Sequence, residues 1–329
     1  MNLFTILSQI EQVDPEVFDR LDARRRVFQH LAGAGQRLAA AALPLAAGAI
    51  FNKTYAQTPS VLGVNDILNF ALKLEYLEMY FYQQRTTLVG ISSVNAAALS
   101  HIATDETNHV AFLRSALGSN AIAAPAVTQF DFTGGRGGTG GPFSDYRTNP
   151  ATYLALAESL EDTGIRAYKG AAPLTALMAN KTVLTAALGI HAVEARHSAQ
   201  IRAMRRAGAS SSTPSQAVAI PPYGTQPKSW ISGIDNGGAA PAYTAPVYGA
   251  GNNGGTATYG SSAQIGSAAG VTFPAEDNAT QAGVSLLSLP NVTGFPTASF
   301  SEAFDEGLDV GTVSAIARTF TIASSTLFS

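Results

Sequence analysis

Two short segments with the same pattern decide the fold. Residues 106–109 read ETNH and residues 194–197 read EARH, so a glutamate precedes a histidine by three positions in each. Each histidine is followed by an alanine two positions later and by an arginine five positions later. Residues three apart lie on one face of an α-helix. Each segment therefore predicts a helix that presents a carboxylate and an imidazole side by side.

A matching segment lies upstream of each pair. Glu75 follows a leucine and precedes Tyr82 by seven residues, and Glu161 follows a leucine and precedes Tyr168 by seven residues. The upstream glutamate lies 31 residues before Glu106 in one half of the repeat and 33 residues before Glu194 in the other. The sequence therefore contains an internal repeat of a helix pair.

Apolar residues with a 3.6-residue period predict four helices, over residues 65–88, 94–118, 150–172 and 181–207. Asn65 or Asp66 is expected as the N-cap of the first, and Asn149 followed by Pro150 begins the third. A glycine-rich connection of about thirty residues joins the second helix to the third. It lacks the Lys-Ser/Thr ending of a phosphate-binding loop, so we expect a flexible crossover. A short turn with the sequence LTALM precedes the fourth helix.

The repeat predicts a metal site. A four-helix bundle that projects Glu, Glu-x-x-His, Glu and Glu-x-x-His inward binds two metal ions. The predicted ligands are Glu75, Glu106, His109, Glu161, Glu194 and His197. Oxygen and nitrogen donors suit iron or manganese, with iron preferred. The chain has no cysteine, which excludes thiolate ligands, disulfides and iron–sulfur clusters.

Neighbouring residues leave alternatives open. Glu78 and Glu158 lie three positions from Glu75 and Glu161 and could replace them, although the leucine and tyrosine register favours the assigned pair. Tyr82 and Tyr168 are either hydrogen-bond partners of the ligands or core aromatic residues. For the remaining histidines and the two repeated arginines we expect structural or surface roles, with ion pairs for the arginines: His30, His101, His191, Arg114 and Arg202.

The helical segments carry a resemblance to a known family. LNFALKLEYLEMYFY, HIATDETNHVAFLRSALG, FDFTGG, LALAESLEDTGIRAYKGAAPL and GIHAVEARHSAQIRAM resemble the bacterial and plant ferritin-like domain family that includes desiccation-related proteins. The resemblance covers about residues 60–208 and implies an all-α, ferritin-like four-helix bundle with a long crossover between helices 2 and 3. It places the ligand roles on the same six residues. It implies a fold and a metal site more than a defined reaction, and it suggests a part in oxidative or desiccation stress protection.

The rest of the chain differs in composition. Residues 1–60 contain Arg24-Arg25-Arg26, an uncharged apolar run over 38–50 and a small-residue cleavage point near Ala56, the parts of a Tat-type export signal. The alternative is a retained helix that packs on the bundle in a cytoplasmic protein. Residues 209–329 hold only nine charged residues and read as a Gly/Ala/Ser-rich irregular or β-containing extension that ends in a short helix, with Asp309 as its cap.

Two function classes follow from these observations. The first is an oxidoreductase that oxidises Fe(II) or reduces O₂ or peroxide, as a ferroxidase, peroxidase or catalase-like enzyme. The second is an extracytoplasmic structural protein, in which leader and extension make homo-oligomer, lattice or membrane-surface contacts around a vestigial metal site. A net charge of −3 gives no general attraction to nucleic acid. The catalytic residues are not predicted beyond the supporting Tyr82 and Tyr168.

Overall fold

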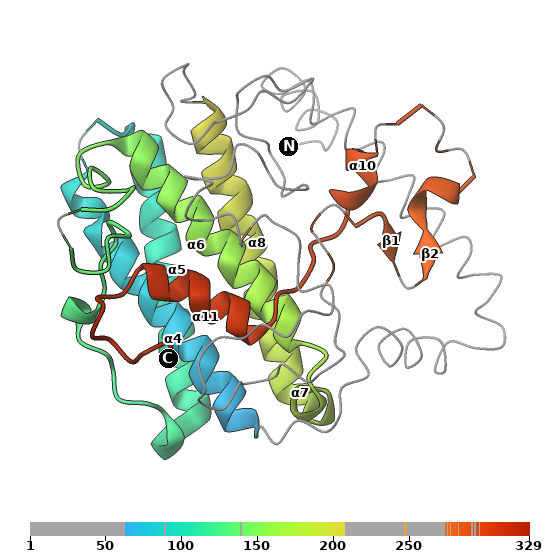
Figure 1. Ribbon diagram of the computed structural model, residues 1–329, viewed down its shortest axis with the longest axis horizontal. Coiled ribbons are helices and arrows are strands. Elements are labelled where there is room, and N and C mark those ends of the chain that lie inside the picture. The colour runs from blue at the N-terminus through green and yellow to red at the C-terminus, as the bar shows by residue number, and fades with distance from the viewer. Residues whose placement is uncertain are drawn as a thin grey trace, which may run out of the picture.

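The computed structural model describes residues 63–88, 90–138, 140–207, 247 and most of 274–329. Four long helices form a bundle (Figure 1) and pack chiefly as two pairs, α4 (Val64–Gln83) with α5 (Ser93–Leu117) and α6 (Pro150–Ala171) with α8 (Lys181–Ala207). This confirms the predicted all-α bundle. The predicted export signal and most of the glycine-rich part of the extension lie outside the described residues.

The ends of the long helices follow local capping chemistry. Ser92 caps α5 by accepting a hydrogen bond from Asn95 N at 3.2 Å, and Asn149 caps α6 through Ala151 N at 3.0 Å. The N-cap predicted for the first helix was wrong. Gly63 is the N-cap of α4, and Asp66 in the first turn accepts from Gly63 N at 3.0 Å.

Two connections differ from the sequence-based expectation. The first helix ends at Gln83 and continues as a 3₁₀ turn, η1 (Gln84–Thr87), where we expected one helix to Leu88. The segment before the fourth helix, expected as a turn, contains a short helix, α7 (Thr175–Ala179). Leu177 of α7 is buried, so packing of the LTALM side chains stabilises an extra helical turn.

The long crossover between α5 and α6 is packed on the bundle, where we expected a flexible connection. It contains the 3₁₀ turns η2 (Gly118–Asn120) and η3 (Val127–Gln129). Four of its aromatic side chains are buried: Phe130, Phe132, Phe143 and Tyr146. The carboxylate of Asp131 accepts hydrogen bonds from the backbone and hydroxyl of Thr133 and from Gly137 N, which closes the glycine-rich loop.

The C-terminal extension adds small elements and one covering helix. A two-stranded antiparallel ribbon, β1 (Thr280–Gln281) with β2 (Val284–Ser285), is followed by η4 (Leu286–Ser288) and α10 (Ala298–Ser301). The last helix, α11 (Val310–Thr319), lies across the bundle and contacts α6 (Figure 1). Asp309 caps it through Thr312 N at 3.0 Å, as predicted. No described helix is long and apolar enough to cross a bilayer.

The extension shares the core of the bundle. Val313, Ile316 and Phe320 belong to the same cluster of buried apolar residues as Leu72 and Phe81 of α4. A separate small cluster of Leu286, Val292 and Phe300 lies under the ribbon segment. Helix α11 therefore stabilises the bundle through burial of apolar surface.

Candidate metal centre

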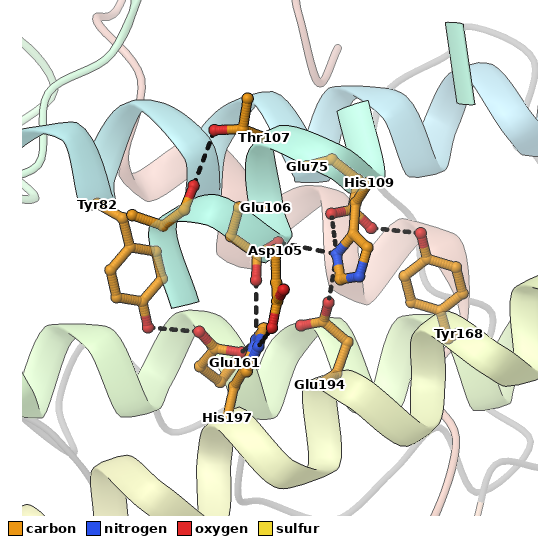
Figure 2. A network of polar contacts seen from close by, with 11 residues as sticks. Glu75, Tyr82, Asp105, Glu106, Thr107, His109, Glu161, Tyr168, Glu194 and His197 are labelled. Atoms are coloured by element: carbon orange, nitrogen blue, oxygen red, sulfur yellow. Dashed lines mark hydrogen bonds and ion pairs between the residues drawn. The ribbon is translucent and has the colours of Figure 1, made fainter. Parts of the chain in front are cut away.

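The structure brings the six predicted ligands together inside the bundle (Figure 2). They form two overlapping donor groups, and within each group one ligand atom per residue lies within 4.8 Å of the others. The first group is Glu75, Glu106, His109 and Glu194, and the second is Glu106, Glu161, Glu194 and His197. Glu106 and Glu194, the glutamates of the two Glu-x-x-His pairs, belong to both groups. Shared carboxylates of this kind can bridge two ions.

The first group is centred on the imidazole of His109. Its Nδ1 lies 3.1 Å from Glu75 Oε2 and 3.1 Å from Glu106 Oε2. Glu194 Oε1, from the other half of the repeat, lies 3.3 Å from the same nitrogen. Three helices, α4, α5 and α8, therefore aim one donor each at the same point.

The second group repeats the arrangement with the two halves exchanged. His197 Nδ1 lies 2.8 Å from Glu106 Oε1 and 3.3 Å from Glu161 Oε2. The two imidazole rings lie 6.2 Å apart between centroids. The internal sequence repeat thus becomes a pseudo-symmetric pair of sites on opposite sides of Glu106 and Glu194.

Burial of these groups fits a metal centre. The four glutamates are fully buried, with no exposed surface. Among the described residues, Glu194 Oε2 has no hydrogen-bond partner, and Glu106 Oε1, Glu161 Oε2 and Glu194 Oε1 have only an imidazole nitrogen beside them, at 2.8 Å, 3.3 Å and 3.3 Å. Buried carboxylates without donors are costly unless a cation compensates them. Oxygen and nitrogen donors of this kind suit iron or manganese.

The pKa values show that burial and repulsion between neighbouring carboxylates oppose ionisation of the glutamates in the site. Burial and the neighbouring Glu194 raise the pKa of Glu106 to about 8. Burial and Glu161 raise the pKa of Glu194 to about 8. Burial alone would lower the pKa of His197, but Glu161 and Glu106 outweigh it and raise the pKa to about 12. Without a cation the site therefore retains protons, which an incoming metal ion would displace.

Tyr82 and Tyr168 are hydrogen-bond partners of the predicted ligands. The hydroxyl of Tyr82 on α4 donates to Glu161 on α6, and that of Tyr168 on α6 donates to Glu75 on α4 (Figure 2). Both residues are also part of the apolar core. The two alternatives that the sequence left open are thus both realised, because each ring packs in the core while its hydroxyl orients a carboxylate across the bundle.

Glu78 lies at the edge of the site. It is buried, and its Oε1 would lie 3.1 Å from a Cβ placed on Gly164, while Glu194 Oε2 would lie 2.9 Å from the same Cβ. Burial and then Glu194 raise the pKa of Glu78 well above its usual range. Glu78 is a further carboxylate beside the two groups without belonging to either, and Gly164 leaves the space for it.

Glu158, the other alternative ligand, belongs to a different cluster. Its carboxylate pairs with Arg205 and lies 3.4 Å from Arg202, and Arg202 also pairs with Asp162. These groups are buried between α6 and α8, so Arg202 forms an inter-helix ion pair and is not a surface residue. Its counterpart in the repeat, Arg114, is exposed and donates to Tyr76 Oη and to the carbonyl of Ile122.

The remaining described histidines lie outside both donor groups. His101 is exposed on α5, as expected. His191 is half-buried on α8, where burial lowers its pKa, and we expected it at the surface. His30 lies outside the described residues.

The sequence analysis missed one residue of the site. Asp105 Oδ2 lies 3.1 Å from His197 Nε2, the ring nitrogen that faces away from the carboxylates (Figure 2). A carboxylate on the second nitrogen fixes the orientation of a metal-binding imidazole. The sequence feature that could have indicated Asp105 is its position next to Glu106, but acidic residues are too common on helix surfaces for this position to stand out. The corresponding residue before Glu194 is Val193, so the repeat gave no support.

Comparison with known proteins agrees with this geometry. Residues 63–207, from the start of α4 to the end of α8, match the ferritin-like domain family. The helical bundle of this chain is therefore a ferritin-like domain, as the resemblance implied. No curated protein and no solved structure gave a significant match.

Proposed function

We propose that the ferritin-like domain holds two iron or manganese ions bridged by carboxylates and acts as an oxidoreductase on Fe(II), O₂ or peroxide. The observation that supports it best is the pair of buried donor groups that share Glu106 and Glu194. Four buried carboxylates meet there with two imidazoles between them, so further positive charge inside the bundle would stabilise the site. Stress protection and iron rather than manganese are finer parts of the same proposal and rest on the resemblance.

The roles of the residues follow from their surroundings. Two redox-active ions held by these residues would supply electron exchange with O₂ or peroxide. Glu75 and Glu161 each receive one hydroxyl hydrogen bond, from Tyr168 and Tyr82, which holds one carboxylate oxygen while the other faces the donor group. Asp105 holds the ring of His197 from behind. Burial of the glutamates excludes bulk water from the reacting region.

Metal analysis of a double variant tests the ligand assignment. His109→Ala with His197→Ala should lower iron or manganese from about two ions per chain to less than one, since each donor group loses its only imidazole. The matched control is His101→Ala, which removes an exposed histidine from the same helix as His109. Elemental analysis of the purified full-length proteins gives the ratio. Unchanged metal content in the double variant would refute the assignment.

A second experiment separates the enzyme from a structural metal protein. The metal-loaded wild-type protein should consume O₂ in the presence of Fe(II), or decompose peroxide, and the double variant should not. Two bound ions without turnover of either substrate would instead support the alternative of a structural or assembly protein with a ferritin-like scaffold.

Export and assembly are separate proposals that rest on the sequence. We infer that the Arg24-Arg25-Arg26 segment directs Tat-type export to the periplasm or beyond, and that leader and extension contribute to homo-oligomer contacts. Replacing Arg24 and Arg25 by lysine should retain the protein in the cytoplasm if the first part holds. Light scattering of the full-length protein and of a chain lacking the leader tests the second part.

A further inference from the structure

An apolar cavity lies next to the Tyr168 side of the candidate metal centre, lined by α4, α6, α7, α8 and the covering helix α11. Its volume is about 50 Å³. The lining side chains used below are Phe70, Ala71, Leu74, Tyr168, Val310 and Val313. Nothing in the sequence indicated a ligand pocket at these residues, and the C-terminal extension forms one side of the cavity through Leu308, Asp309, Val310 and Val313.

The lining offers no free polar group to a polar ligand. Among the described residues that line the wall, Tyr168 and Asp309 carry the only polar side chains, and the others are apolar residues and a glycine. The Tyr168 hydroxyl donates to Glu75, and the Asp309 carboxylate accepts from the backbone and hydroxyl of Thr312. An apolar cavity whose polar groups are already satisfied favours apolar occupants over water.

The size of the cavity selects the kind of occupant. An apolar cavity of roughly 150 Å³ is known to accept benzene or xenon. The cavity beside Tyr168, at about 50 Å³, is much smaller than that and favours a smaller occupant. A diatomic gas fits in it.

The position of the cavity connects it to the candidate metal centre. The Tyr168 ring forms part of the wall while its hydroxyl holds Glu75, and Leu74, next to Glu75 in α4, lines the same wall. Phe70, Ala71 and Val310 are only half-buried, so the cavity extends from Tyr168 toward the protein surface. An apolar molecule in it would be one aromatic side chain away from a metal ligand.

We propose that this cavity binds dioxygen and supplies it to the centre through the Tyr168 side of the bundle. The inference rests on the proposed oxidoreductase function and narrows its oxidant, since peroxide is polar and gains nothing from an apolar wall. Helix α11 then has a function beyond covering the core, because Val313 forms part of the gas site.

Xenon binding to full-length protein tests the site without any need for activity. Crystals pressurised with xenon should show xenon between α4, α6 and α11 in the wild type. Val313→Phe should abolish this xenon site, because the larger side chain fills the cavity. The matched control is Ile316→Phe, which enlarges another buried residue of α11 that does not line the cavity and should leave xenon bound.

Kinetics of the metal-loaded variants test the supply of oxidant. Val313→Phe should raise the KM for O₂ about fivefold or more and leave metal content and the rate with peroxide unchanged, while Ile316→Phe changes none of these. Absence of xenon from the wild type, density for a lipid chain or protein segment in the cavity, or equal KM values for the two variants would overturn the proposal. A protein that binds xenon but holds no metal would refute the proposed function and leave the gas site standing.

Discussion

The two imidazoles of the candidate centre have different surroundings. His197 contacts Asp105 through its second nitrogen, whereas Val193 occupies the matching position before Glu194 in the other half. A carboxylate behind an imidazole orients the ring and makes it more basic. At the scale of single residues, the donor groups of His109 and His197 therefore differ, and the two ions should bind with different affinity.

Removal of Asp105 tests this inequality. Asp105→Ala should weaken the ion held by His197 about tenfold, at the lower end of the usual range because the aspartate side chain is half-exposed, and should leave the ion at His109 unchanged. Competitive titration of metal against a chelator resolves the two affinities. The control is Thr104→Ala on the exposed surface of α5. Equal weakening of both ions would contradict the unequal roles of the two histidines.

At the scale of helices, α6 carries a glycine where a helix former would be expected. Alanine is favoured over glycine in a helix interior by about 1 kcal/mol. A Cβ at Gly164 would lie 2.9 Å from Glu194 Oε2 and 3.1 Å from Glu78 Oε1, closer than ordinary van der Waals contact. The space for two carboxylates thus outweighs helix propensity at this position.

Two glycine-to-alanine variants separate these effects. Gly164→Ala should reduce metal binding below two ions per chain, because the added methyl group displaces the Glu194 carboxylate. Gly189→Ala in α8, an exposed position with no neighbouring atom within 4 Å, should raise the free energy of unfolding by about 1 kcal/mol and retain both ions. Chemical denaturation and elemental analysis provide the two measurements. Full metal content in Gly164→Ala would show that the site tolerates the crowding.

At the scale of the whole molecule, the C-terminal extension is attached to α6 through its backbone. Leu308 N donates to the carbonyl of Arg166 at 3.0 Å, and Arg166 Nε donates to the carbonyl of Glu306 and lies 3.2 Å from Glu276 Oε2. The Leu308 carbonyl would lie only 1.9 Å from a Cβ at Gly170. The extension therefore docks where α6 has no side chain.

A side chain at Gly170 should detach this segment. Gly170→Ala is expected to lower the free energy of unfolding by about 2 kcal/mol and to speed hydrogen exchange in α11, because backbone atoms must move apart. Metal content should stay near that of the wild type, since Gly170 lies outside both donor groups. Hydrogen-exchange mass spectrometry compares the variant with Gly189→Ala. Unchanged exchange in α11 would show that the docking is not a stabilising contact.

Metal-free protein should lose stability as pH rises. The folded-state pKa of Glu106 and Glu194 is about 8, above the ordinary value of 4.5, and that of His197 is about 12, above the ordinary 6.5. Between pH 6 and 9 the folded state therefore holds more protons than the unfolded chain, and its stability falls as pH increases. Thermal unfolding in a chelator at pH 6 and pH 9 measures this fall.

Metal loading should reverse the trend, because ions bind the deprotonated ligands. The increase in melting temperature on adding Mn(II) should be larger at pH 8 than at pH 6. Glu106→Gln with Glu194→Gln should weaken the pH dependence of the metal-free protein. A melting temperature of the metal-free wild type that rises toward pH 9 would contradict the buried, protonated site.

The sequence by itself determined what depends on residues close together in the chain. Helical periodicity predicted the long helices, Asn149 and Asp309 marked helix starts, and the Glu-x-x-His repeat picked out the residues that the bundle brings together. Each of these signals requires only that side chains within one helical turn share a face or reach a neighbouring backbone group.

Tertiary structure decided what depends on the rotation and approach of whole helices. Glu75 and Glu78 differ by less than one turn, and only the packing of α4 against α5 and α6 places Glu75 in a donor group. Tertiary packing also brings the hydroxyl of each tyrosine to a glutamate on the other helix pair and Asp105 to His197. It places α11 against the cavity as well. These contacts join residues far apart in the chain, so their distances follow from how the core closes and not from any local pattern.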